Sequence, residues 1–177
     1  DFQSTTYNLA YSTVAFVDNV GNAEINGLEL DATYKPNDTL TLSGYVVSND
    51  PSLSEDYYDV SGVLQANSGN RLAYVPELSY VLGLDKVLSI FGMPGYMSID
   101  YSYTGDRYTS QANELKLPSY AIANMRVGVE SNNRSMEVFI SNLTDENGYL
   151  SRYNDFGDIR RTQNRPRVIG LRFKYRY

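Results

Sequence analysis

The stretch RPRVIGLRFKYRY, residues 165–177, alternates apolar and polar side chains up to its last residue. In a strand, one face would carry Ile169, Leu171, Phe173, Tyr175 and Tyr177, and the other Val168, Gly170, Arg172, Lys174 and Arg176. A register shift of one residue would turn three cations outward, at a cost of about 2–4 kcal/mol each in mid-membrane. The same alternation of apolar and polar residues would also occur in an edge strand of a soluble β-sandwich. The tyrosines that end the outward series favour a membrane barrel, which places Tyr at headgroup level.

Composition excludes several classes of protein. The 177 residues are 42% hydrophobic, with 17 Tyr, 6 Phe and no Trp. No apolar run approaches the roughly 18–20 residues of a spanning helix, a limit that does not apply to half-apolar strands. The absence of Cys and His removes disulfides, thiolate nucleophiles, imidazole bases and the usual zinc ligands. We therefore expect no enzyme, no cofactor and no metal, and a pI near 4.6 argues against nucleic acid.

Alternation and turn residues predict about eight antiparallel strands and no helix. We expect them at residues 2–17, 24–34, 39–47, 71–85, 96–103, 118–130, 136–140 and 165–177. Pro76 lies inside the fourth, which would normally mark an edge strand or a bulge.

The lengths of the connections alternate as well. Turns at 35–38, 92–95 and 131–134 are short, whereas the loops at 48–70, 104–117 and 142–164 are long and polar; the first connection is a turn at 18–22. Short turns on one rim and long loops on the other are typical of an outer-membrane barrel, and they place the C-terminus on the short-turn rim. The predicted fold is all-β, an antiparallel up-and-down transmembrane β-barrel segment.

Two hairpin registers follow from matching the apolar faces. A three-residue loop near Pro36 would pair Tyr34 with Leu40, Ala32 with Leu42 and Leu30 with Gly44. A two-residue loop at Asn132-Asn133 would pair Val127 with Val138 outward and Gly128 with Glu137 inward. Arg126 would then lie diagonally beside Glu137, within reach of an ion pair.

Four segments, NAEINGLEL (22–30), RLAYVPE (71–77), NLTD (142–145) and RPR (165–167) before an alternating aromatic terminus, resemble the C-terminal barrel of TonB-dependent receptors. The resemblance covers nearly the whole chain. Gly27 and Glu29 match the family's strand motif after an extracellular turn, and Pro76 a proline tolerated near a strand top. Tyr177 matches the terminal aromatic of the insertion signal, which is more often Phe.

The resemblance implies that residues 1–177 are one barrel piece with no plug domain and no signal peptide. Because a plugged transporter barrel has 22 strands, the chain would be the C-terminal part of a larger barrel. The parent would import a scarce ligand, expected to be a ferric siderophore, across the outer membrane of a Gram-negative bacterium. Implied partners are outer-membrane lipid, the barrel insertion machinery, the plug domain, the remaining strands and, through the plug, the energy-coupling TonB protein.

Two alternatives stay open: a stand-alone eight-stranded outer-membrane barrel with a structural or adhesion role, and a soluble β-sandwich that acts as a binding module. An isolated piece would leave its first and eighth strands unpaired unless it closed into a small barrel, so we expect no transport by these residues alone. The outward series Ile169, Leu171, Phe173, Tyr175 and Tyr177 would also serve as the insertion signal.

Charge is unevenly distributed along the chain. Residues 1–151 hold 7 basic and 19 acidic side chains, a net charge of −12, whereas residues 152–177 hold 8 basic and 2 acidic, a net charge of +6. The candidate contacts for an anionic ligand or for lipopolysaccharide phosphates are Arg152, Arg160, Arg161, Arg165 and Arg167. They could instead pair with the acidic loops. The pairs Glu29 and Asp31, or Asp155 and Asp158, lack a partner base or nucleophile and are interpreted as polar residues of a lumen face or a loop.

Overall fold

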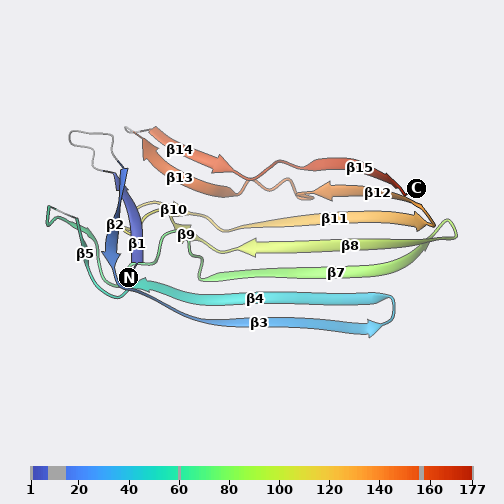
Figure 1. The fold of residues 1–177 in the computed structure, drawn as a ribbon, viewed down its shortest axis with the longest axis horizontal. Helices are drawn as coiled ribbons and strands as arrows, with labels where there is room; N and C mark the ends of the chain where they lie inside the picture. The colour runs from blue at the N-terminus through green and yellow to red at the C-terminus, as the bar shows by residue number, and fades with distance from the viewer. Residues whose placement is uncertain (1, 8–14, 60, 156–157, 177) are drawn as a thin grey trace.

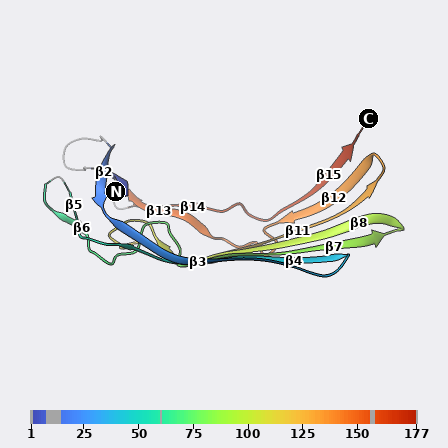
Figure 2. The same ribbon diagram turned by 60° about the horizontal axis from the view of Figure 1, so that its bottom comes forward.

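The computed structural model describes residues 2–7, 15–59, 61–155 and 158–176, and they form an all-β structure (Figure 1). Seven antiparallel strands make one sheet in the order β15-β12-β11-β8-β7-β4-β3. These strands are β3 (Ala23–Asn37), β4 (Leu40–Leu53), β7 (Leu78–Ile90), β8 (Met93–Thr104), β11 (Tyr120–Ser131), β12 (Arg134–Ser141) and β15 (Val168–Tyr175). The sheet is curved (Figure 2) and open, with β3 and β15 as its edges. No helix among the described residues is long and apolar enough to cross a membrane.

Four two-stranded hairpins lie at one end of this sheet (Figure 1). They are β1 (Phe2–Tyr7) with β2 (Ala15–Gly21), β5 (Tyr57–Tyr58) with β6 (Leu64–Ala66), β9 (Arg107–Tyr108) with β10 (Lys116–Leu117), and β13 (Tyr149–Asp155) with β14 (Asp158–Gln163). The short turns lie at the opposite end, so the predicted alternation of short and long connections is confirmed. The last three hairpins occupy segments that were expected to be loops. The sequence did not predict these hairpins because the segments are polar and show no alternation of apolar residues.

The prediction of a first barrel strand at residues 2–17 was wrong, which leaves seven strands in the sheet instead of about eight. Phe2–Tyr7 and Ala15–Gly21 pair with each other, and residues 8–14 lie outside the described part. The predicted turn at 18–22 falls mainly within β2. The change of direction occurs at Gly21, whose φ of +92° is a conformation that glycine adopts without steric cost.

The predicted end of one strand and the predicted start of another were wrong, and a proline lies near each. β4 continues six residues past Val47 to Leu53 and includes Pro51. Its pairing with β7 stops at Ser48, so the missing N–H of Pro51 costs no bond to that strand. β7 begins at Leu78 instead of residue 71, because Pro76 and Tyr74, with φ +62°, interrupt any extended run before it.

Pairing of β11 with β12 confirms the predicted register, Val127 with Val138 and Gly128 with Glu137, and Asn132 in the turn has φ +42°. The predicted turn at 92–95 is instead Phe91-Gly92, where both φ values are positive, as a two-residue type I′ turn requires.

The predicted β3–β4 register was wrong by two residues: Tyr34 pairs with Leu42, and the turn is Asp38-Thr39. The extra residues form an irregularity between Tyr34 and Asn37, where Pro36 could not have donated to the ladder. The Asn37 side chain accepts hydrogen bonds from the Thr39 N–H (3.0 Å) and hydroxyl (2.8 Å), which stabilises the tighter turn. A shift of two preserves both faces, so alternation could not reveal it.

Candidate functional site

One surface of the sheet, the apolar face, carries the outward residues of all seven strands. Its large exposed side chains include Leu28, Leu30, Tyr34, Leu42, Leu82, Tyr101, Met136, Val138, Ile169, Leu171, Phe173 and Tyr175, which range from 36% exposed for Tyr101 to 76% for Leu171. Towards the hairpin end, the ring of Tyr80 stacks on Tyr103 with 4.9 Å between centroids. A broad apolar surface with aromatic rings near its limit suits a hydrocarbon environment. The predicted outward series of β15 lies here, while Tyr177 is outside the described residues.

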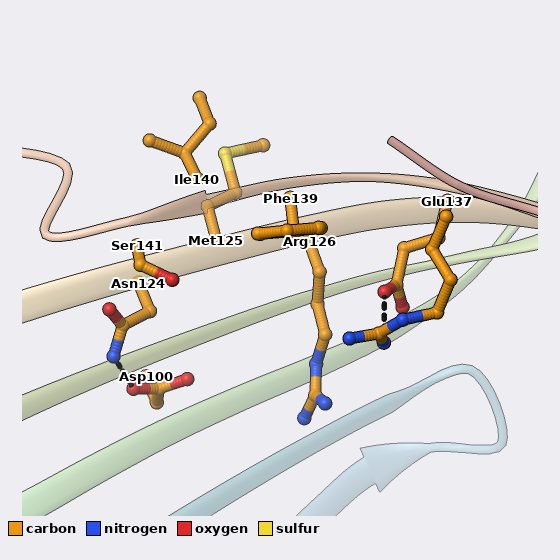
Figure 3. A pocket seen from close by; sticks show the side chains of 9 residues that line it. Asp100, Asn124, Met125, Arg126, Glu137, Phe139, Ile140 and Ser141 are labelled. Carbon is orange, nitrogen blue, oxygen red and sulfur yellow. Dashed lines mark hydrogen bonds and ion pairs between the residues drawn. The ribbon is translucent and has the colours of Figure 1, made fainter. Parts of the chain in front are cut away.

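The opposite surface, the polar face, holds partnered carboxylates. The Ser98 hydroxyl donates to Asp85 at 2.6 Å, and the Asn124 amide donates to Asp100 at 2.6 Å. Figure 3 shows Asp100, Asn124 and Arg126 on one side of the sheet, and Met125 and Ile140 on the other. Polar side chains that bind one another on one face, with bare hydrocarbon on the other, give the two faces of the sheet opposite solvent preferences.

The most buried acid of the polar face is Glu137, which is 8% exposed. It accepts a hydrogen bond from Tyr96 at 2.5 Å and forms an ion pair with Arg172 at 2.7 Å. Arg126 shares this face, as predicted, but among the described residues it forms no ion pair with Glu137. Arg172 takes that role because it lies directly opposite Glu137 on β15, whereas Arg126 is a diagonal neighbour.

Two adjoining cavities open on the polar face, of about 310 and about 400 Å³. They share Asn124, Phe139 and Ser141. The first includes Asp100, Arg126, Glu137 and Arg172, and the second includes Ile122, Val168, Asn142, Asn164 and Arg165. Together they form a groove whose lining changes from charged to partly apolar towards the hairpin end.

Asn142, which is 3% exposed, organises the base of the β13–β14 hairpin. Its side-chain amide donates to the carbonyls of Glu146 (2.9 Å) and Arg165 (3.0 Å), and its side-chain oxygen accepts from the Glu146 N–H (2.9 Å). The Asp145 carboxylate accepts from the Arg167 N–H at 2.8 Å. The segment NLTD therefore holds together the two ends of the last long connection, a structural reason for this part of the resemblance.

The five arginines proposed as anion contacts do not converge on one point. Arg152 and Arg161 face each other across β13 and β14, so they share one face of that hairpin, while Arg160 lies opposite Tyr153 and on the other face. Arg161 donates to the Tyr149 hydroxyl at 2.8 Å. Arg165 lines the larger cavity, and Arg167 lies 3.9 Å from an Asp145 oxygen. The structure thus brings together Arg152 and Arg161 and separates the others.

A charged cluster that the sequence analysis missed connects two long loops. The Asp106 carboxylate lies 2.9 Å from Arg71 and 3.0 Å from Lys116, and Arg71 also lies 3.2 Å from Glu77. The hydrogen bond from Lys116, with that from Arg71, lowers the pKa of Asp106 against the opposing effect of burial, and it raises the pKa of Lys116. Arg71 and Asp106 are 35 residues apart, so no local pattern could have paired them.

The carboxylate pairs considered for acid–base chemistry lie on β3 and on the β13–β14 hairpin. Glu29 and Asp31 lie on the polar face of β3, where Glu29 accepts a hydrogen bond from the Tyr45 hydroxyl at 3.1 Å. Asp158 begins β14 opposite Asp155. Within the described ranges, no three acidic side chains are grouped to hold a metal ion.

A curved antiparallel wall with an apolar face, a polar face and rims of unequal loop length defines the class of outer-membrane β-barrels. Residues 1–143 match the family described as "TonB dependent receptor-like, beta-barrel". The chain belongs to this family. Its members are outer-membrane barrels of Gram-negative bacteria that act as transport receptors, not as enzymes.

Solved receptors share this fold at low sequence identity. The ferric yersiniabactin uptake receptor FyuA from Yersinia pestis is 17% identical with a TM-score of 0.78, over 90% of this chain and 24% of that one. The siderophore receptor PiuA from Acinetobacter baumannii is 21% identical with a TM-score of 0.75, over 91% and 23%. BauA, the ferric preacinetobactin receptor of the same species, is 17% identical with a TM-score of 0.68, over 98% of this chain and 25% of that one. The chain thus spans about a quarter of the length of these receptors.

Proposed function

We propose that this chain forms the C-terminal part of the barrel wall of an outer-membrane receptor that imports a ferric siderophore. The observation that carries the proposal is the two-faced sheet with short turns on one rim and hairpin-bearing loops on the other. Family membership supports a TonB-dependent mechanism, and the names of FyuA, PiuA and BauA support an iron-loaded ligand.

The unpaired edges β3 and β15 indicate what the wall needs in order to work. In lipid, each unsatisfied backbone group of an open edge costs several kcal/mol, so further strands must close the barrel. We propose that the rest of a parent receptor supplies these strands and a plug domain that contacts the TonB protein. Cells that produce only residues 1–177 should therefore take up no ligand, and uptake by them would contradict this part of the proposal.

Uptake of radioactive iron by iron-starved cells tests the function itself. Cells that produce the complete receptor as their only siderophore receptor should accumulate iron from at least one siderophore of a panel of catecholate, hydroxamate and mixed types. Deletion of the tonB gene should abolish this uptake. If no siderophore restores uptake while the receptor is present in the outer membrane, the iron-loaded ligand is wrong.

Two arginines of the last long connection, Arg152 and Arg161, are proposed to contact anionic groups, either of the ligand or of lipopolysaccharide. Arg152 and Arg161 are the pair to test, because they share one face of the β13–β14 hairpin. Replacement of both by Gln should weaken ligand binding if they hold the siderophore, or sensitise cells to detergent if they bridge lipopolysaccharide phosphates. Arg160→Gln, on the other face, is the matched control. No change in either property would contradict the assignment.

The terminal series that ends at Tyr177 is proposed as the signal for the barrel insertion machinery. Loss of the Tyr177 ring should cost the folded barrel only about 1 kcal/mol, the range of one interfacial aromatic contact. In the complete receptor, Tyr177→Ala should nevertheless sharply lower the amount of heat-modifiable barrel in the outer membrane, and Tyr177→Phe should restore it. Wild-type insertion of the alanine variant would mean that β15 is only a wall element.

A further inference from the structure

The apolar face carries very few charges, and their signs are segregated. In the seven strands of the sheet, leaving aside the irregularity at residues 35–36, the pairing assigns four charged residues to this face. They are Glu24, Asp50, Lys86 and Arg134. The two acids lie at the hairpin end, where β3 pairs with the last part of β4. The two cations lie at the short-turn end. Between them the face carries no charged residue.

Lys86 is held at the short-turn rim by its position and by a hydrogen bond. It lies opposite Leu40, the first residue of β4, and its ammonium group donates to the Thr39 hydroxyl at 2.8 Å. Thr39 belongs to the turn that ends the β3–β4 hairpin. The aliphatic part of Lys86 therefore follows the apolar face while its charge reaches the turn, the arrangement of a lysine at an interface between hydrocarbon and water.

Arg134 also lies at the short-turn end, on the next hairpin of the sheet, where the pairing places Lys86 in line with Val138 and Arg134 closer to the turn. It is the first residue of β12, lies opposite Tyr175, and places its guanidinium 5.6 Å from the centre of that ring. Within the described residues, neither Arg134 nor Lys86 forms an ion pair with a carboxylate. Both cations therefore keep charged donors for an anion that approaches from the outside of the sheet.

We propose that Arg134 and Lys86 bind the phosphate groups of anionic phospholipids in the leaflet that meets the short-turn rim. The inference rests on the proposed function, since it requires the apolar face to be embedded in lipid. The lipid tails would cover the charge-free middle of the apolar face, and the phosphates would lie towards the short-turn end, which the Lys86 ammonium reaches at Thr39 and Arg134 reaches at the start of β12. Guanidinium and ammonium groups are the side-chain donors that suit phosphate oxygens, and basic residues bind anionic lipid surfaces additively.

Lipid retention by the complete receptor tests this assignment. The receptor is reconstituted in nanodiscs of equal parts phosphatidylglycerol and phosphatidylcholine, extracted into neutral detergent, and its retained lipids are measured by mass spectrometry. Phosphatidylglycerol should be enriched on the wild type. Lys86→Gln and Arg134→Gln should each lower this enrichment by up to about fivefold, the change that corresponds to about 1 kcal/mol per basic residue near an anionic surface. The double variant should lose more than either single variant.

Lys174→Gln is the matched control, because Lys174 lies opposite Ser135 near the same rim but on the polar face. It should leave the lipid ratio unchanged. Equal enrichment on all variants, or an equal loss with Lys174→Gln, would overturn the inference while the proposed function stands. Displacement of the lipid by inorganic phosphate at equal ionic strength would overturn it as well, since the site would then be a general anion site. A receptor that does not enter nanodiscs at all would overturn the proposed function itself.

Discussion

The sheet and its hairpin end bury apolar residues in opposite ways. At the hairpin end, Leu53, Tyr57, Ala66 and Leu72 form a small core in which Leu53 is 1% exposed and Leu72 is 3% exposed. In the sheet, leucines of the same chemistry are turned outward, as Leu171 at 76% exposed illustrates. The hairpin end therefore packs as a water-soluble domain does, whereas the sheet presents its hydrocarbon to its surroundings.

This difference locates the two sources of stability. Burial of Leu53 and its neighbours is complete within the described chain, so it should stabilise the hairpin end in any solvent. The exposed leucines of the apolar face gain free energy only when lipid, detergent or another apolar surface covers them. Substitutions that exchange an apolar for a polar side chain should therefore have effects that depend on the region.

The largest effect is expected from Leu53→Ala in the core of the hairpin end. Removal of a fully buried leucine side chain should lower local stability by about 2–5 kcal/mol, because a cavity remains in addition to the lost hydrophobic contact. Deuterium exchange of the complete receptor in detergent should become faster in peptides covering residues 53–72, with the sheet unchanged. Leu64→Ala is the control, since Leu64 lies nearby in β6 but is 44% exposed. Equal acceleration by both variants would mean that this core stabilises nothing.

Leu171→Arg tests the opposite region. If lipid covers the apolar face, a charge in the middle of β15 should cost about 2–4 kcal/mol, measured by urea unfolding of the receptor in lipid vesicles. Thr33→Arg is the control, because Thr33 is exposed on the polar face of β3 and pairs with Ser43. It should change the unfolding free energy by a few tenths of a kcal/mol only. A larger loss for Thr33→Arg would reverse the assignment of the two faces.

The sequence predicted these faces well because alternation acts at every residue. All seven strands of the sheet, the placement of long and short connections, and the pairing of Val127 with Val138 followed from local patterns. The same period of two could not distinguish Tyr34 opposite Leu40 from Tyr34 opposite Leu42, since both registers keep the faces. Nor could it find the hairpins within the long loops, where neither face is uniformly apolar.

The candidate site was predictable only in part, for a similar reason. The composition of the last loop identified its arginines, but their separation onto two faces depends on the pairing of β13 with β14. The cluster around Asp106 depends on contacts between loops more than thirty residues apart. The groove on the polar face required the registers of β11, β12 and β15 together.

The polar face should respond more weakly, and selectively, to loss of its ion pair. Arg172→Ala would leave the nearly buried Glu137 with Tyr96 as its one side-chain hydrogen-bond donor among the described residues, at a cost of about 1–3 kcal/mol. Arg126→Ala removes an arginine from the same face that has no ion pair with Glu137, and should cost about 0.5 kcal/mol or less. Urea unfolding of both variants gives the comparison. Equal costs would show that Glu137 interacts with the two arginines as a group.

The smallest effect concerns the pH dependence of the ion pairs that connect the two long loops. These ion pairs join Asp106 to Arg71 and to Lys116. Because the folded state lowers the pKa of Asp106, this carboxylate stabilises the loops above its unfolded pKa, near 4, and loses that contribution as pH falls through its folded value. Because the folded state raises the pKa of Lys116, its contribution is complete below an unfolded pKa near 10.4 and is lost above that value. These ion pairs should therefore stay formed across the neutral pH range and should be lost first in acid.

Deuterium exchange of residues 71–77 measures this loss, because the Tyr74 N–H donates to the Tyr108 carbonyl across the two loops. After correction for intrinsic exchange rates, protection in the wild type should stay constant from pH 6 down to about pH 4 and fall below that value. Asp106→Asn should be less protected at pH 6 and should lose most of the pH dependence, because the amide cannot ionise. The effect should be modest, since the Asp106 side chain is 39% exposed and water screens its partners. Unchanged pH dependence in Asp106→Asn would contradict the assignment of the acid sensitivity to Asp106.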